Sequence, residues 1–248
     1  MPPLRPGLLA LTFLGLLASL PLLGQTEGET TAQQAPAAAP AAVAPASAAP
    51  KGDALLLYRQ GRDLEGSGKT AEATALYQQA VAICETELAA DPRRMDASAV
   101  KCWCLFRLGR HQEVVDTGAA ALKYVFDGRV AEVMGESYYY LGKNDLTLRY
   151  FQRYIESGQY PDRIATAYFF MGETYLRMKK WSHADIAYTA AVRREPSMSR
   201  WWYRLGQTCE NLGEWQRATD AYGKALSLQP SMKEATEGMA RVKPKIGT

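Results

Sequence analysis

The sequence predicts an all-α protein: a right-handed superhelical solenoid of about five helix-turn-helix repeats that ends in a capping helix. Three observations lead to this prediction. The C-terminal third of the chain resembles itself when it is shifted along its own sequence. The spacing of small and aromatic residues inside that repeat recurs upstream. Apolar residues within each unit also follow the periodicity of amphipathic helices.

The clearest repeat lies near the C-terminus, where a shift of 34 residues aligns residues of the same kind. The aligned pairs are Phe169 with Tyr203, Gly172 with Gly206, Trp181 with Trp215, Ala184 with Ala218, Tyr188 with Tyr222, Ala191 with Ala225, and Pro196 with Pro230. Upstream, Gly61, Gly68, Ala73, Tyr77 and Ala80 take the same steps as the last unit. The predicted units are about 54–94, 95–127, 128–164, 165–198 and 199–232, followed by a cap at 233–243.

Each unit is expected to form two short helices separated by a helix-breaking turn. The turns are expected at Gly68, Gly109, Gly142, Lys179-Lys180 and Gly213. A small residue on the first helix lets the second helix approach closely, and an aromatic residue of the second helix fills the remaining gap. No unit can bury its apolar face alone, so the units are expected to stack.

The last two units resemble the tetratricopeptide repeat, a family of helix-pair repeats. The residues that carry the resemblance are Trp202, Leu205, Gly206, Gly213, Ala218, Tyr222, Ala225 and Pro230, with Cys209 in place of the usual Tyr. The resemblance extends over residues 54–232 and is weakest over 95–127. It implies a scaffold that recognises proteins or peptides, while partners differ widely among proteins of this kind.

The N-terminal region does not have the composition of a folded domain. Residues 1–24 have the layout of a secretory signal peptide, with a retained membrane anchor as the alternative. Residues 25–50 form an Ala/Pro-rich segment that we expect to be a disordered linker, because it has little apolar surface to bury. The repeat domain is then expected at 51–243. Export predicts a location in the cell envelope, with the bacterial periplasm as the first choice.

Several functional classes find no support in the sequence. The formal net charge is +3, and no basic stripe predicts nucleic-acid binding. No grouping of nucleophile, base and acid predicts an enzyme, and no His or Cys spacing predicts a metal or cofactor. Glu132 and Glu136, one helical turn apart, are more typical of a solvated face or a partner contact than of paired catalytic carboxylates. Among the cysteines, Cys84 and Cys102 are the preferred disulfide pair, and Cys209 is expected to be a buried thiol.

The expected binding surface is a concave groove lined by the first helix of each unit. The candidate residues are aromatic, Arg and Glu side chains on the side of those helices that packing is not expected to use. They are Tyr58, Arg62, Trp103, Phe106, Arg107, Glu132, Glu136, Tyr139, Phe169, Glu173, Arg177, Arg200 and Tyr203. Residues of these types are enriched at binding hot spots. We therefore expect a non-catalytic scaffold that binds a protein or peptide. The alternatives are packing of these aromatics between units, and an accessory protein that binds an apolar small molecule in the groove or in a pore.

Overall fold

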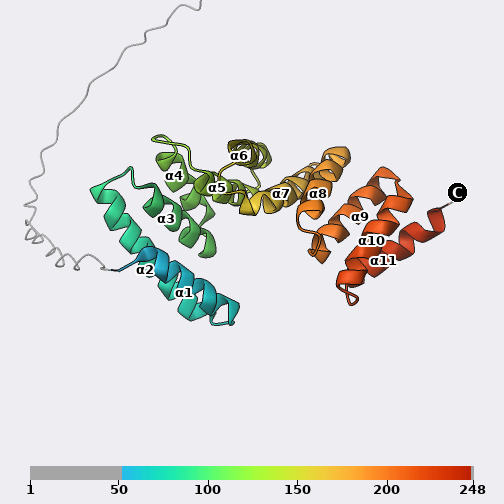
Figure 1. The fold of residues 1–248 in the computed structure, drawn as a ribbon, viewed down its shortest axis with the longest axis horizontal. Helices are drawn as coiled ribbons and strands as arrows, with labels where there is room; N and C mark the ends of the chain where they lie inside the picture. The colour runs from blue at the N-terminus through green and yellow to red at the C-terminus, as the bar shows by residue number, and fades with distance from the viewer. Residues whose placement is uncertain (1–51, 247–248) are drawn as a thin grey trace, which may run out of the picture. The chain divides into compact units, whose positions relative to one another are not determined.

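The computed structural model describes residues 52–246, which form a succession of α-helices with no strand among them (Figure 1). The predicted signal segment and the Ala/Pro-rich linker lie outside the described residues. The helices are α1 Ala54–Gly66, α2 Thr70–Ala90, α3 Met95–Arg107, α4 His111–Ala121, α5 Gly128–Tyr140, α6 Asn144–Ser157, α7 Ile164–Arg177, α8 Trp181–Arg194, α9 Ser199–Leu212, α10 Trp215–Leu228 and α11 Lys233–Val242. Two short 3₁₀ turns complete this part of the chain, η1 at Pro161–Arg163 and η2 at Lys243–Lys245.

The helices pack in adjacent pairs, as the repeat predicts. The pairs are α1 with α2, α3 with α4, α5 with α6, α7 with α8, and α9 with α10. The second helix of each pair also packs against the first helix of the next pair, and α11 closes the stack against α9 and α10. First helices contact one another as well, α1 with α3, α3 with α5, and α5 with α7. These contacts place side chains from successive first helices on one shared surface.

The turns within the pairs fall where the sequence predicts them. Gly68, Gly109, Gly142 and Gly213 all have φ between 71° and 79°, a left-handed conformation that glycine adopts without steric cost. The fourth pair has Lys179 at this point, with φ of 57°. A lysine in that conformation is strained relative to glycine, so the turn is held by the surrounding helix pair rather than by its own preference.

Glycine and tyrosine form the close contact inside three of the pairs. A Cβ atom on Gly61, Gly172 or Gly206 would lie 2.5–2.7 Å from the ring of the tyrosine on the second helix of the same pair. Glycine is therefore required there, because those distances are shorter than any normal carbon–carbon contact. The tyrosine rings of Tyr77, Tyr188 and Tyr222 are almost completely buried. This arrangement confirms the predicted pairing of a small residue with an aromatic one.

The apolar core is divided into three clusters along the stack. One joins α1 to α5, a second joins α7 to α11, and a small third cluster lies between them. The third contains only Ala131, Phe151, Tyr154 and Ala167 as buried residues. The middle of the repeat domain therefore has the least continuous apolar packing.

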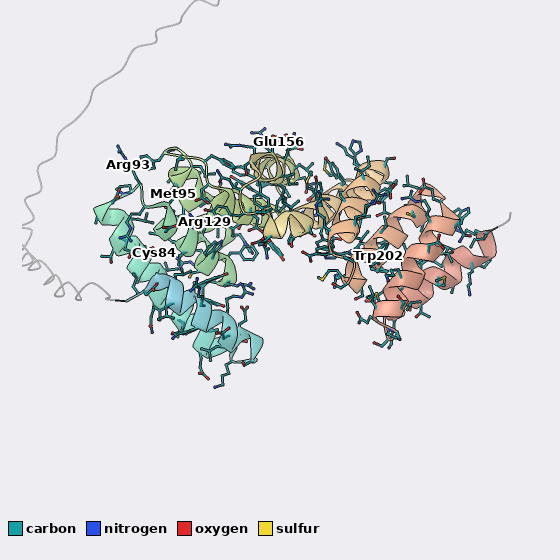
Figure 2. The ribbon with its side chains drawn as sticks, in the orientation of Figure 1. Cys84, Arg93, Met95, Arg129, Glu156 and Trp202 are labelled. Atoms are coloured by element: carbon teal, nitrogen blue, oxygen red, sulfur yellow. The ribbon has the colours of Figure 1, made fainter. Side chains whose placement is uncertain are left out.

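The expected disulfide between Cys84 and Cys102 is not formed, so that prediction is wrong. Cys84 lies on α2 (Figure 2), whereas the Cys102 thiol on α3 is directed at the carbonyl of Val114 in α4, with an Sγ–O distance of 3.7 Å. All four cysteines are buried free thiols, and the prediction for Cys209 is confirmed. Burial raises the pKa of Cys84, Cys102 and Cys104 to about 12 and that of Cys209 to about 11. The thiols behave here as small apolar side chains.

Across residues 52–246, no helix combines the length and the apolar character that crossing a bilayer requires.

Candidate functional site

The first three helix pairs enclose a pocket of about 300 Å³, which we call the inner pocket. Side chains from α1, α3, α5 and α6 line it together with the loop between α6 and α7. They are Tyr58, Arg62, Trp103, Phe106, Arg107, Arg129, Glu132, Val133, Glu136, Tyr154, Tyr160, Asp162 and Arg163. Seven of these residues, from Tyr58 to Glu136, belong to the set predicted from the sequence. The structure therefore brings together about half of the candidate residues.

A second pocket of about 790 Å³, the N-terminal pocket, adjoins the inner pocket and shares Tyr58, Trp103 and Arg129 with it. It continues past the beginning of α1 and along α3, where Leu55, Asp96 and other residues line it. Because three side chains belong to both pockets, they form one continuous hollow. We call this surface the α1–α3–α5 groove.

Aromatic rings form the wall between the two pockets. The ring centroids of Tyr58 and Trp103 are 5.4 Å apart, with an angle of 31° between the ring planes. Arg62 donates a hydrogen bond to the Tyr58 hydroxyl, with an Nη1–O distance of 3.3 Å. Further along α3, Phe106 contacts the ring of Tyr140, with centroids 5.8 Å apart. All of these rings except Tyr140 are half-buried, so they have faces that a ligand can reach.

A buried pair of carboxylates forms the floor of the inner pocket. Glu132 and Glu136 are only 6% and 5% exposed. Arg163, from the loop after α6, donates from Nε to Oε1 of Glu132 at 2.7 Å and contacts Oε1 of Glu136 through Nη2. Burial and the neighbouring Glu132 carboxylate raise the pKa of Glu136 well above its ordinary value, and Arg163 only partly offsets this effect. One guanidinium thus faces two carboxyl groups with little solvent.

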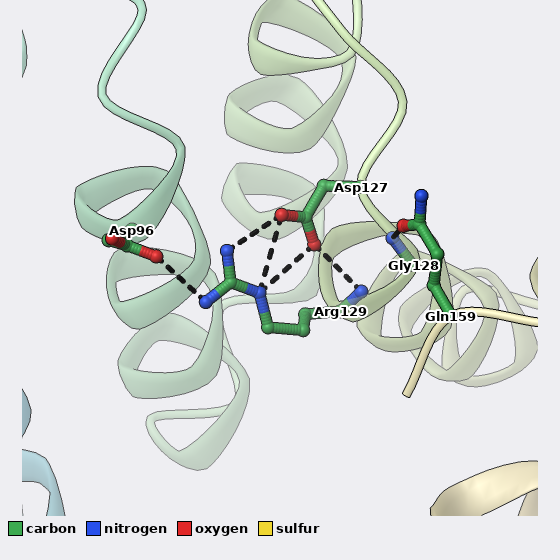
Figure 3. Close-up of polar contacts among 5 residues, drawn as sticks. All are labelled: Asp96, Asp127, Gly128, Arg129 and Gln159. Atoms are coloured by element: carbon green, nitrogen blue, oxygen red, sulfur yellow. Dashed lines mark hydrogen bonds and ion pairs between the residues drawn. The ribbon is translucent and has the colours of Figure 1, made fainter. Parts of the chain in front are cut away.

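The loop between α6 and α7 forms one side of the inner pocket and is attached to the beginning of α5. The Gly128 amide donates to Oε1 of Gln159 at 2.8 Å (Figure 3). Tyr154 donates its hydroxyl hydrogen to the carbonyl of Tyr160, whose backbone has a left-handed φ of 52°. The guanidinium carbon of Arg129 lies 5.0 Å from the centroid of the Tyr160 ring. These contacts hold a strained loop in place, and its side chains complete the pocket.

Arg129 links α3 to the first turn of α5 (Figure 3). Its Nη1 lies 2.8 Å from Asp96 in α3, and its Nη2 lies 2.7 Å from Asp127, the residue that caps α5. Hydrogen bonding to Asp127 raises the pKa of Arg129, so the guanidinium stays charged. The arginine therefore fixes how the first helices of the second and third pairs meet.

The remaining predicted residues lie outside both pockets, in the fourth and fifth helix pairs or on the far end of α5. Tyr139 lies under Arg177, whose guanidinium carbon is 4.1 Å from the ring centroid. Phe169 stacks on Trp201 with centroids 5.2 Å apart. Tyr203 is half-buried beside Tyr222, and Arg200 is exposed. The structure does not bring this second set into one cavity.

Glu173 shows why part of the prediction fails. It is 8% exposed and accepts hydrogen bonds from the Tyr188 hydroxyl at 2.5 Å and from Nη2 of Arg204 at 3.0 Å. The expectation that packing does not use these positions is wrong for Glu132, Glu136 and Glu173, which are buried in polar networks, and for Phe169. The role of the predicted residues in binding stays a prediction.

Sequence analysis missed the pocket residues that come from the α6–α7 region: Tyr154, Tyr160, Asp162 and Arg163. One signal was present. The third unit, 128–164, contains 37 residues, whereas the next unit, 165–198, contains 34. The three additional residues lengthen the connection between α6 and α7, which is the loop that forms the side of the pocket.

Over residues 52–246, the side chains do not place three or more His, Cys, Asp or Glu residues together in a way that could hold a metal ion.

Comparisons with known proteins agree with this architecture. Residues 199–232 match the family described as Tetratricopeptide repeat. YrrB, described as a tetratricopeptide-repeat protein with an unusual peptide-binding site, is 20% identical, and the match covers 76% of this chain and 92% of YrrB with a TM-score of 0.54. MamA is 19% identical, and the match covers 73% of this chain and 96% of MamA with a TM-score of 0.56. No curated protein sequence matched the chain.

At these identities the solved structures speak for the fold alone. They agree with the helix pairs, the left-handed turns and the glycine–tyrosine contacts described above. The repeat at residues 199–232 is matched by its own sequence as well as by its structure. The protein is therefore a tetratricopeptide-repeat protein whose helix pairs stack as a solenoid.

Proposed function

We propose that this protein is a non-catalytic scaffold that binds a segment of a partner protein in the α1–α3–α5 groove. The observation that carries the proposal is the continuity of the two pockets across three successive first helices. A continuous hollow with several subsites suits an extended or helical segment whose side chains enter one after another. Tyr58, Trp103 and Phe106 supply the half-buried aromatic faces that commonly anchor such segments.

The composition of the inner pocket favours a peptide over an apolar small molecule. Seven of its thirteen lining residues are charged: Arg62, Arg107, Arg129, Glu132, Glu136, Asp162 and Arg163. An apolar ligand would have to desolvate these groups without offering hydrogen bonds in return, which is unfavourable. A peptide carries backbone and side-chain groups that can replace the lost water.

Site-specific photocrosslinking in the native cell tests this proposal. A photoreactive phenylalanine analogue is placed at Trp103 and, in a matched variant, at Trp202, a half-buried tryptophan on α9 outside the groove. We expect the variant at position 103 to crosslink to one defined segment of a partner, and the variant at position 202 not to do so. Equal labelling from both positions would move the binding surface away from the groove.

The identified segment then serves as a synthetic peptide for titration. We expect Trp103→Ala to weaken binding by about 1–4 kcal/mol, because the side chain lies at the junction of the two pockets. Trp202→Ala should leave the affinity unchanged. Circular dichroism of both variants checks that the helices are retained. Unchanged affinity in a folded Trp103→Ala protein would refute the groove as the binding site.

We also propose that the protein acts in the cell envelope, on the basis of the apolar run within residues 1–24. Alkaline phosphatase fused after residue 50 tests this directly, because that enzyme requires export to form its disulfides. An active fusion is expected, and an inactive one would contradict export. Deletion of residues 2–24 is the matched control and should abolish the activity.

A further inference from the structure

The inner pocket carries an excess of negative charge. Its lining residues and their ion-pair partners include four arginines: Arg62, Arg107, Arg129 and Arg163. They include six carboxylates: Glu65, Asp96, Asp127, Glu132, Glu136 and Asp162. If all are ionised, the difference of four and six is a net charge of −2 around a cavity of about 300 Å³. Such a cavity attracts a cation more strongly than an anion.

The excess is concentrated at the floor. Arg107 is matched by Glu65 at 3.6 Å, and Arg129 by Asp96 and Asp127. Arg163 must neutralise both Glu132 and Glu136, and it contacts only Oε1 of each. The Oε2 atoms lie outside that contact. The raised pKa of Glu136 reflects the same imbalance, because two buried carboxylates share one positive charge.

The walls of the pocket suit the same kind of ligand group. Tyr58, Trp103 and Phe106 present half-buried rings next to the acidic floor. Aromatic faces attract ammonium and guanidinium groups through the ring quadrupole, and the attraction increases when the cation is desolvated. Arg129 already uses the Tyr160 ring in this way. A pocket with carboxylates below and aromatic rings at the side is therefore complementary to a long basic side chain.

We propose that the inner pocket is a subsite for one lysine or arginine side chain of the bound partner segment, with its charged end at Glu132 and Glu136 and its methylene groups against Trp103. This inference rests on the proposed function and adds the chemistry of the segment. Arg163 is half-exposed on its loop, so it can shift to keep one carboxylate while the incoming cation takes the other. The N-terminal pocket then holds the neighbouring residues of the segment.

Two short peptides test the subsite on the full chain. The first is acetyl-Ala-Ala-Lys-Ala-Ala-amide, and the second has norleucine, which has a similar length but no charge, in place of lysine. Saturation-transfer NMR and titration give the two dissociation constants. We expect the lysine peptide to bind at least roughly tenfold more tightly than the norleucine peptide.

The two glutamates provide the matched variants. The double substitution Glu132→Gln and Glu136→Gln keeps the size of the side chains and removes their charge, so the preference for lysine should fall to about twofold or less. Glu173→Gln changes a buried glutamate of the same kind outside the pocket and should keep the full preference. The comparison of lysine with norleucine in the unchanged protein stands even if the double variant does not fold.

The outcomes separate this inference from the proposed function. Equal binding of the two peptides, or binding of neither, overturns the cation subsite. So does a preference for lysine that survives in a folded double variant. The crosslinking at position 103 is measured independently of these peptides, so its success or failure decides the groove proposal whatever the peptides show.

Discussion

Gly206→Ala is the sharpest test of the packing between paired helices. A Cβ atom at this position would lie 2.6 Å from Cδ1 and 2.7 Å from Cε1 of Tyr222. The ring cannot retreat, because Gly238 of α11 lies on its other side, where an added Cβ would be 2.5 Å from Cζ. The Tyr222 hydroxyl is also held by Glu210 at 2.6 Å. The new methyl group must therefore push two helices apart.

The expected magnitude is the difference between two opposing effects. Overpacking a filled core costs about 1–3 kcal/mol, and a ring held on both sides places this contact near the upper end of that range. Replacing glycine by alanine inside a helix returns about 1 kcal/mol through helix propensity. We therefore expect Gly206→Ala to reduce the free energy of unfolding by about 1–2 kcal/mol.

Gly223 in α10 provides the control, since it is in the same repeat and also inside a helix. A Cβ there would meet only the end of Met239 at 3.6 Å, an ordinary contact. Gly223→Ala should then stabilise the protein by about 0.5–1 kcal/mol. The two alanine variants should differ in melting temperature by about 4–12 °C for a domain of this size.

Circular dichroism and tryptophan fluorescence during urea and thermal unfolding measure both variants. The tryptophans Trp201, Trp202 and Trp215 report on the repeat that carries the substitutions. The reasoning would be refuted if Gly206→Ala were as stable as Gly223→Ala, because the ring would then not occupy the space between Gly206 and Gly238.

Three other outcomes follow from the structure. Tyr222→Ala should cost about 3–5 kcal/mol in the free energy of unfolding, measured by urea denaturation, because a fully buried ring leaves a cavity. The four cysteines should resist iodoacetamide at neutral pH in the folded protein, since burial raises their pKa, and all four should react in urea without reductant; recovery of a disulfide-linked peptide by mass spectrometry would contradict this. The raised pKa of Glu136 means that the folded state binds a proton more tightly than the unfolded state, so its contribution to stability grows as pH falls through the raised pKa toward the ordinary value of 4.5. Glu136→Gln should flatten the dependence of the melting temperature on pH in that range, whereas an unchanged slope would show that another group is responsible.

The repeat could be predicted from the sequence because its packing is local and recurs. Gly172 and Gly206 occupy equivalent positions, each against a tyrosine sixteen residues further along, so the contact is repeated in the sequence. The same holds for the turns at Gly142 and Gly213. A pattern that recurs at a fixed interval reveals both the helices and the way in which they stack.

The candidate site was harder to predict because its key contacts do not recur. Arg163 reaches Glu132 and Glu136 from a loop that is longer than in the next unit, and no other unit offers an equivalent arginine to compare. The burial of Glu173 depends on Arg204 in the following pair. Sequence spacing alone placed these glutamates on the correct helical face but could not show which of them are neutralised by a distant cation.

The division of the core into three clusters has a consequence for how the domain opens. Where apolar packing is interrupted, a stack of repeats separates into units that open independently, with less free energy than complete unfolding requires. Amide protons of α1 to α5 and of α7 to α11 should therefore exchange as two cooperative groups, with α6 and the following loop forming the boundary. A partner held in the α1–α3–α5 groove would slow exchange in the first group alone. Occupancy of the groove could thus be read from one half of the domain while the other half serves as an internal reference.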